Sequence, residues 1–358
     1  MTTVLDYESN RIVELMDQPV EVRGADWLKE SLQQAILLEL ATLPPYLCGM
    51  WSIVDPGPDE RVHQALRTIV FDEMSHLGIA CNLLTTIGGS PRLADFRTVP
   101  KYPGPLPGGV RPGLTVFLSG LTEESLDLYA RIEEPDDPLV ESKAAHTSIG
   151  AFYTAIQTAF RSHPELITGA RQVIKNMGHH GAGNTLKELR TLTAVESAIA
   201  VIKEQGEGTS ASPENPHPKE SGELAHFYAF REIRRGRELA KVPDEYPERW
   251  DFIGPEIPLP PRLLMGVVPS GGWPREGPSA PGQETLDRLD EVNGAYSAML
   301  GFIEQAWQQD VPAQATALLG KAVKKMRDLE EPAVALMGTA LPDGSGNTYG
   351  PEFRYVDT

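Results

Sequence analysis

The sequence of 358 residues predicts a mainly α protein built around a four-helix bundle. Apolar residues recur at helical spacing in several segments, and strand signals are few. The pattern Glu-x-x-His also occurs twice, at Glu73 and His76 and again at Glu223 and His226. Residues three apart share one face of a helix, so each quartet would direct a carboxylate and an imidazole to the same point. Two such pairs, with one Glu from each of two further helices, hold two iron or manganese ions in four-helix bundles.

The first two bundle helices are expected within residues 27–87. Residues 1–26 are interpreted as an N-terminal leader, and residues 27–240 as the bundle. Apolar residues predict one helix over residues 27–43 and another from about residue 59 to residue 87, before Gly88 and Gly89. Pro44 and Pro45 are expected to interrupt the first helix, because proline lacks the N–H that an interior position needs.

The remaining bundle helices follow a long insertion. Residues 90–135 are predicted to be an inserted, Pro-rich loop that carries only a short helix over residues 123–132. The same apolar periodicity predicts further helices, which lie at residues 139–161, 193–205 and 221–237. Residues 241–358 are expected to form a Pro-rich connection and a C-terminal helical pair, residues 285–308 and 313–337, that packs on the bundle.

Composition excludes several classes of partner. The chain has 50 acidic and 32 basic residues and a net charge of −18, whereas nucleic acid and anionic membranes require a basic face. No stretch approaches 18 uninterrupted apolar residues, and the acidic N-terminus lacks the apolar segment of a secretory signal. The cytoplasm is therefore the expected location. The sequence contains no GxGxxG, P-loop or GxSxG motif, so nucleotide-binding and serine-hydrolase functions lack support.

Glu39, Glu73 and His76 are the first candidate metal ligands. Glu39 lies within an apolar helical run, where a carboxylate without a partner costs several kcal/mol or loses its charge. A metal ion would remove that cost; the alternative is an Arg partner or a turn of the side chain towards solvent. Glu73 and His76 lie among apolar residues, and their alternative is a surface Glu with a satisfied core His. Carboxylate and imidazole together suit iron, manganese or zinc.

The later candidates compete with one another. His226 precedes a run of aromatic residues, whereas Glu223 could be only an acidic charge at a helix N-terminus. Glu207 lies between Gly206 and Gly208, which would allow close backbone approach, and its alternative is a solvated helix end. Among the other histidines, His146 is a candidate neighbour of the site, and the pair at residues 179–180 is expected to be solvated.

A series of motifs, in order from about residue 27 to residue 355, resembles one known family. The motifs are Leu43-Pro44-Pro45-Tyr46-Leu47, Glu73-Met74-Ser75-His76-Leu77, Asn82-Leu83-Leu84, residues 100–108, Ile132-Glu133-Glu134-Pro135, Ser148-Ile149-Gly150, Phe152-Tyr153-Thr154, Gln205-Gly206-Glu207-Gly208, Glu223-Leu224-Ala225-His226, Asn293-Gly294-Ala295-Tyr296 and Gly350-Pro351-Glu352-Phe353-Arg354-Tyr355. The sequence resembles the ferritin-like family of iminophenyl-pyruvate dimer synthases, which includes a ferritin-like part of a violacein-pathway enzyme.

This resemblance implies a ferritin-like bundle that binds iron, with manganese as an alternative. The ligands it implies are Glu39, Glu73, His76, Glu207 and His226. The family pattern also expects a Glu after Ser148-Ile149-Gly150, where this chain has Ala151. The difference leaves three outcomes open: a mononuclear centre, substitution by Glu223 or Glu204, or an open coordination position for O2 or substrate.

The function that the resemblance implies is oxidative chemistry in specialised metabolism. We expect a non-haem iron-dependent oxidase or oxygenase that acts on a small amino-acid-derived substrate, aromatic in part, with O2. Tyr153 and Tyr228 are candidate catalytic residues, with core packing as their alternative role. A metal-storage protein and a catalytically inactive scaffold are the alternative functions, and a homodimer is left open.

Overall fold

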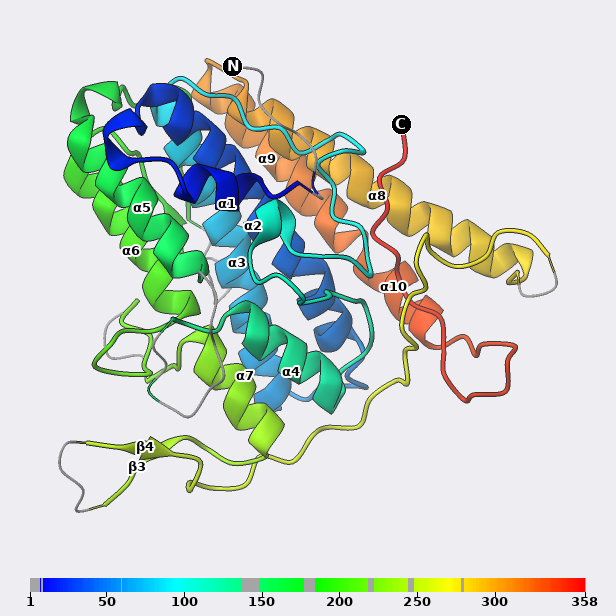
Figure 1. Cartoon of the computed structure of the whole chain (residues 1–358). Coiled ribbons are helices and arrows are strands. Elements are labelled where there is room, and N and C mark those ends of the chain that lie inside the picture. The colour runs from blue at the N-terminus through cyan, green and yellow to red at the C-terminus, as the bar shows by residue number, and fades with distance from the viewer. Residues whose placement is uncertain are drawn as a thin grey trace.

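Two long helices form the centre of the fold. In the computed structural model, which describes residues 7, 9–58, 60–136, 139, 148–176, 184–217, 222–243, 248–277 and 280–357, helix α2 (Ala25–Trp51) packs along α3 (Arg61–Thr86). Almost every residue of α2 is buried, polar ones such as Glu30, Gln34 and Glu39 included, so other elements pack on all sides of this helix. Other elements surround these two helices in Figure 1.

The other half of the bundle is built from four shorter helices. Their bounds are α4 (Glu123–Ile132), α5 (Ile149–Ser162), α6 (Leu192–Gly206) and α7 (His226–Arg235). Helix α5 packs on α6, and α4 packs on α7, so these helices form two pairs, one above the other in Figure 1. We call α4 with α5, and α6 with α7, the two outer rods of the bundle, and each rod is broken between its two helices. Side chains of Thr122, Ser148 and Thr191 cap the N-termini of α4, α5 and α6.

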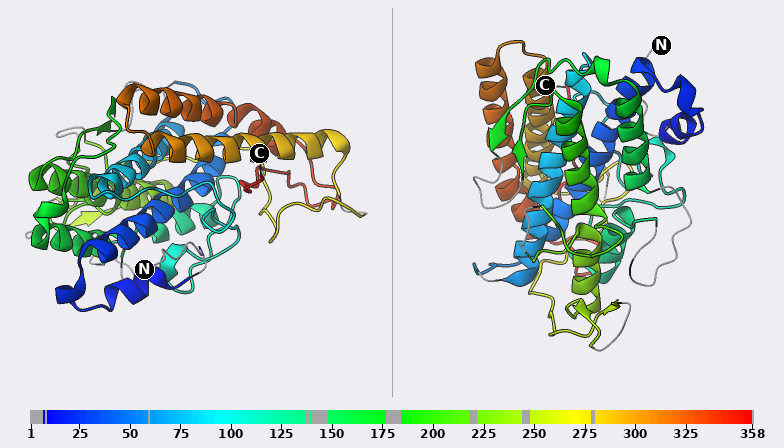
Figure 2. Two further views of the ribbon diagram at one scale, coloured as in Figure 1. Left: turned by 90° about the horizontal axis from the view of Figure 1, so that it is seen from above. Right: turned by 90° about the vertical axis from the view of Figure 1, so that its left-hand side faces the viewer.

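The C-terminal helices form a further layer against the bundle. Helices α8 (Gln283–Trp307) and α9 (Pro312–Arg327) run side by side in Figure 2, and α10 (Glu330–Met337) packs on α8 and α2. The predicted pair is present, but the single helix predicted over residues 313–337 was wrong. Residues 328–329 separate α9 from α10, because Asp328 caps α9 and α10 begins a new N-terminal turn with Glu330 and Glu331.

Short elements complete the described chain. Helix α1 (Arg11–Met16) lies within the range interpreted as a leader and packs on α2, where Arg11 forms a two-point ion pair with Glu30 at 2.7 Å. Two antiparallel strand pairs are present, β1 (Lys175–Asn176) with β2 (Thr185–Leu186), and β3 (Ala240–Lys241) with β4 (Trp250–Asp251).

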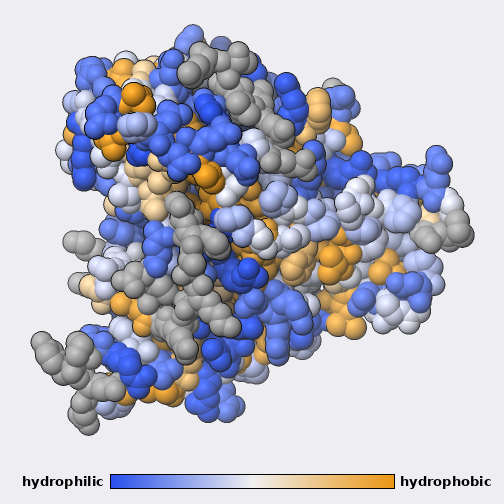
Figure 3. All heavy atoms as spheres, viewed as in Figure 1, coloured by the Kyte–Doolittle hydropathy of each residue, from blue (hydrophilic) through white to orange (hydrophobic). Residues whose placement is uncertain are grey.

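Hydrophilic residues cover much of the face in Figure 3, with hydrophobic residues in smaller groups between them. None of the helices in the described part of the chain is long and apolar enough to cross a membrane.

Helix α2 continues through Pro44 and Pro45, so the predicted interruption was wrong. In an α-helix, the N–H of residue 45 would donate a hydrogen bond to the carbonyl of Ala41. Proline has no N–H, so Pro45 cannot form this bond. The hydroxyl of Tyr102 replaces that donor and lies 2.8 Å from the Ala41 oxygen. The Pro-rich insertion thus supplies the hydrogen bond that the helix has lost.

The Tyr102→Phe variant is expected to lose about 1–2 kcal/mol of unfolding free energy, because the buried Ala41 carbonyl is left without a donor. Tyr296→Phe is the matched control, since the buried Tyr296 hydroxyl has no hydrogen-bond partner among the described residues. Urea unfolding measures both variants. Equal stability of the two would contradict the role given to Tyr102.

Candidate metal centre

The breaks in the outer rods bring helix ends to the middle of the bundle. Glu133 caps the C-terminus of α4, Glu207 caps the C-terminus of α6, and His226 is the first residue of α7. These three side chains lie near Glu39 of α2 and near Glu73 and His76 of α3. Two continuous helices and three helix termini therefore supply the polar groups of one buried cluster.

The cluster contains two groups that share Glu73. One consists of Glu39, Glu73 and His76, and the other of Glu73, Glu133 and His226. Within each group, one possible ligand atom from every residue lies within 4.8 Å of the others. All five side chains are buried. We call these groups the first triad and the second triad.

The two imidazoles lie on either side of Glu73. The Nδ1 atom of His76 is 3.3 Å from Glu73 Oε1, and Nδ1 of His226 is 2.9 Å from the same oxygen. The rings are stacked with their centroids 5.7 Å apart. Neither ring nitrogen of His226 forms a hydrogen bond in the described part of the chain, despite its burial. A buried nitrogen beside a carboxylate but outside hydrogen-bond geometry is suited to a shared cation.

Hydrogen bonds on the far side of His76 determine which of its nitrogens carries the proton. The side-chain amide of Gln205 donates to the carbonyl of His217 at 2.9 Å, so its Oε1 faces His76. That oxygen also accepts from Asn184 at 2.6 Å and lies 2.9 Å from His76 Nε2. Because Oε1 can only accept, Nε2 carries a hydrogen, and in the neutral imidazole Nδ1 offers its lone pair to the first triad. Outer partners orient metal-binding histidines in the same way.

Hydroxyl groups orient the carboxylates. The hydroxyl of Tyr153 donates to Glu39 Oε1 at 2.5 Å, and that of Tyr46 donates to Glu133 Oε1 at 2.6 Å. The hydroxyl of Thr42 donates to Glu73 Oε2 at 2.8 Å. One oxygen of each carboxylate is held in this way, and the other oxygens of Glu39 and Glu73 face the imidazole of His76. Tyr228 is also buried, but its hydroxyl accepts a hydrogen bond from the backbone N–H of Leu139.

The charges of the cluster are strongly coupled. Burial and the Glu73 carboxylate raise the pKa of Glu39 to about 8 and that of Glu133 to about 7. Burial opposes ionisation of Glu73 as well, but the two imidazoles hold its pKa well below the usual range. Burial would lower the pKa of His76, yet Glu73 raises it to about 9. The buried carboxylates therefore require positive charge beside them, supplied either by protons or by metal ions.

Glu207 adds a fourth carboxylate. The N–H of Gly150, at the N-terminus of α5, donates to Glu207 Oε1 at 2.7 Å, where a helix favours negative charge. A Cβ at position 150 would overlap with this carboxylate, so the close approach requires glycine. Glu207 lines a cavity of about 20 Å³ together with Glu39, Glu73, His76, Glu133 and Tyr153. This volume holds about one water-sized species.

Ala151 stands where the family pattern expects a Glu, but the carboxylate of Glu207 lies at the same N-terminus of α5. Residues 149, 150 and 153 line the cavity from α5, without Ala151. Among the described residues, the five buried groups of the triads and the half-buried Glu207 make four Glu and two His, which is the composition of a site built from two Glu-x-x-His pairs and two further Glu residues. This chain reaches that composition with one Glu-x-x-His quartet on a helix.

Glu223 does not lie in either triad. Helix α7 begins at His226 rather than near residue 221, because Gly222 has a positive φ of 70° and Leu224 forms an isolated bridge with Glu214. The helical spacing predicted for Glu223 and His226 was therefore wrong. Glu223 instead lines a cleft of about 370 Å³ together with Asp72 and His226. Burial and Asp72 raise the pKa of its carboxyl group.

Other expectations have different outcomes. Glu133 was not among the predicted ligands, although the sequence Ile132-Glu133-Glu134-Pro135 marks a helix end that a proline follows. Glu204 pairs with His217 at 2.7 Å and belongs to neither triad.

The third bundle helix begins at Ile149, and Leu139 lies outside it, since Ser148 caps the helix. His146 and the pair at residues 179–180 lie outside the described residues.

Comparisons with known proteins agree with this architecture. The ferritin-like family model matches residues 32–235, which is more than half of the chain. The chain therefore belongs to the ferritin-like family. The crystal structure of a ferritin like protein from Caulobacter vibrioides has the same fold, with a TM-score of 0.58 and 20% sequence identity over 92% of this chain and 97% of that chain. Among proteins with curated functions, none matches this chain.

Glu133→Gln is expected to reduce the amount of Fe(II) that the protein retains, because an amide replaces the carboxylate of the second triad. Glu39→Ala and His76→Ala should have the same effect through the first triad. Glu204→Gln and Glu223→Gln are matched controls and should retain the metal. Metal analysis after gel filtration, with helical content followed by circular dichroism, measures the outcome. Wild-type iron content in Glu133→Gln would exclude that residue as a ligand.

Proposed function

We propose that this chain is a non-haem iron-dependent oxidoreductase with a dinuclear metal centre. The observation that carries the proposal is the pair of buried triads that share Glu73. Each triad offers one histidine and two carboxylates, a donor set that suits iron and also manganese. Because each triad is a separate donor set, the two triads would hold two ions rather than one. The ligands in this proposal are Glu39, Glu73, His76, Glu133, Glu207 and His226.

Iron in this centre would supply the one-electron chemistry that O2 requires. The protein groups around it hold protons and exclude water. Burial and Glu39 raise the pKa of Tyr153 far above its usual value, so this tyrosine keeps its proton and donates a hydrogen bond to Glu39 Oε1. Burial and Glu133 likewise raise the pKa of Tyr46, which keeps its proton and donates a hydrogen bond to Glu133 Oε1. Tyr153 is therefore the better placed of the two tyrosines that the sequence indicated, and Tyr228 contributes to the aromatic packing.

The size of the spaces around the centre indicates how reactants approach. The inner cavity of about 20 Å³ admits a water-sized molecule and no organic substrate. The outer cleft of about 370 Å³ reaches His226 and Asp72 and is large enough for a small molecule. We propose this cleft as the substrate approach. The motifs shared with iminophenyl-pyruvate dimer synthases support an amino-acid-derived substrate, aromatic in part, and a role in specialised metabolism.

The long insertions also support an enzyme over a storage protein. A metal-storage bundle requires only short connections between its helices. Here the insertion that begins after α3 supplies Tyr102 to the proline-containing part of α2 and ends with α4 and Glu133. The connections therefore contribute directly to the centre.

Anaerobic titration with Fe(II) is expected to saturate at two ions per chain, one for each triad. Subsequent exposure to O2 should give consumption that depends on an added amino-acid-derived substrate. The Glu73→Ala variant should lose both ions, since both triads contain this residue, whereas Glu204→Gln should behave as the native chain does. Oxygen consumption without substrate, with a ferric mineral as product, would indicate storage. Failure to retain any metal would indicate a scaffold.

A further inference from the structure

A second cavity lies between the bundle and the C-terminal helices. Its volume is about 310 Å³, and α2, α3, α8 and α9 all contribute to its walls. This size falls at the lower end of the range for small-molecule pockets. It is roughly fifteen times the volume of the cavity at the metal centre.

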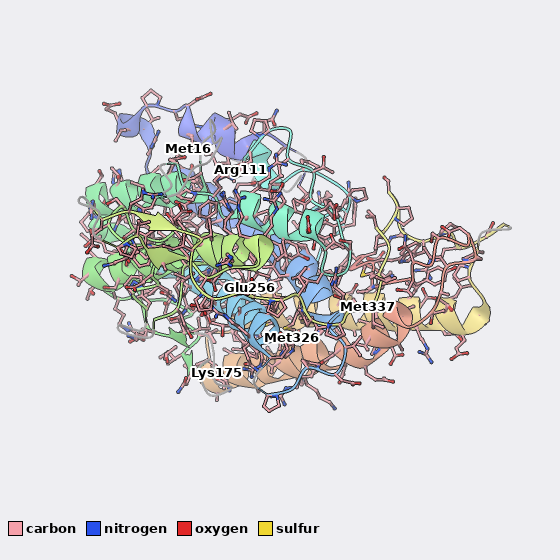
Figure 4. All side chains as sticks on the ribbon, turned by 90° about the horizontal axis from the view of Figure 1, so that it is seen from below. Met16, Arg111, Lys175, Glu256, Met326 and Met337 are labelled. Atoms are coloured by element: carbon pink, nitrogen blue, oxygen red, sulfur yellow. The ribbon has the colours of Figure 1, made fainter. Side chains whose placement is uncertain are left out.

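The second cavity faces away from the metal centre. On α2 its walls include Leu40 and Leu43, which directly follow Glu39 and Thr42 in the chain, and on α3 they include Leu77, which follows His76. One residue turns about 100° around a helix, so these neighbours point to different sides. In Figure 4, Lys175 and Met326 of the second cavity lie towards the edge formed by α8 and α9. Arg111, whose guanidinium is 3.6 Å from Glu134 beside the metal centre, lies towards the opposite edge.

The walls of the second cavity are mainly apolar. Aliphatic and Met side chains predominate, and Tyr296, Trp307 and Phe353 add aromatic surface. The ring of Tyr296 meets that of Phe353 edge-on, with centroids 5.3 Å apart. The indole N–H of Trp307 donates to Asn82 at 2.8 Å, so its polar group is satisfied elsewhere. Such walls favour the hydrocarbon part of a ligand.

Charge in the second cavity is of one sign. Among the described residues of its walls, the charged ones are Lys175 and Arg327 and none is a carboxylate, although the whole chain has a net charge of −18. Within the described part of the chain, neither side chain has an ion-pair partner closer than 4 Å. Asn176 adds an amide next to Lys175. An unpaired cation at the border of an apolar cavity favours an anionic group on the ligand.

We propose that this cavity binds an amphipathic carboxylate, with an unbranched hydrocarbon chain between the bundle and α9 and its carboxylate at Lys175 or Arg327. The site is independent of the metal centre, because none of the triad residues lines it. The proposal therefore does not rest on the oxidoreductase function.

Isothermal titration of the full chain with decanoate, decanol and decyltrimethylammonium, each below its micelle concentration, tests the proposal. Decanoate is expected to bind most tightly and the cation most weakly. Val323→Trp fills the cavity from α9 and should weaken decanoate at least about tenfold, the effect of displacing two methylene groups. Ala317→Trp, at an exposed position of the same helix outside the cavity, is the matched control.

The charge contribution is tested separately. Replacement of both cations by glutamine (Lys175→Gln with Arg327→Gln) should weaken decanoate about three- to tenfold and leave decanol unchanged. Lys324→Gln removes an exposed charge of α9 outside the cavity and should have no effect. Absence of saturable decanoate binding would overturn the proposal. Equal affinity for the native chain and Val323→Trp, or for decanoate and decyltrimethylammonium, would overturn it as well.

Discussion

Burial of negative charge in the middle of the bundle is the constraint on which the rest of the structure depends. Three carboxylates and two imidazoles are buried here beside the half-buried Glu207, and an isolated buried charge is among the most unfavourable groups in a protein. Every neighbouring polar group reduces this cost. Tyrosine and threonine hydroxyls donate to the carboxylates, Gln205 accepts from His76, and the N-terminus of α5 lies against Glu207. Such a cluster is stable only with positive charge in its centre.

The broken outer rods follow from the same requirement. A continuous helix offers a side chain to the centre only once in each turn, whereas a helix end also offers its unpaired backbone groups and its cap residue. Glu133, Glu207 and His226 all occupy such ends. The bundle therefore has two interrupted outer rods, and their helix ends place additional polar groups around the candidate metal centre.

Much of the fold could be predicted from helical periodicity, because the long helices bury a regular apolar face. The uninterrupted course of α2 could not, since it depends on Tyr102, which is distant in sequence from Pro45. The candidate ligands on α2 and α3 were also predictable, because one regular helix carries both Glu73 and His76. Glu133 and the position of Glu223 were not. Where a helix begins or ends depends on caps and loop geometry, and the spacing of residues in the sequence says little about side chains beyond that end.

The sharing of Glu73 makes the two halves of the centre unequal. One half belongs to a hairpin of adjacent helices, which can assemble early from contiguous chain, whereas the other half also needs residues 133 and 226. The donors of the first triad thus lie on two helices that are adjacent in sequence, with Tyr153 of α5 and Gln205 of α6 orienting them, whereas the second triad also requires the ends of α4 and α7. Separation of α4 and α7 from the bundle would therefore open the second triad and leave the donors of the first triad together.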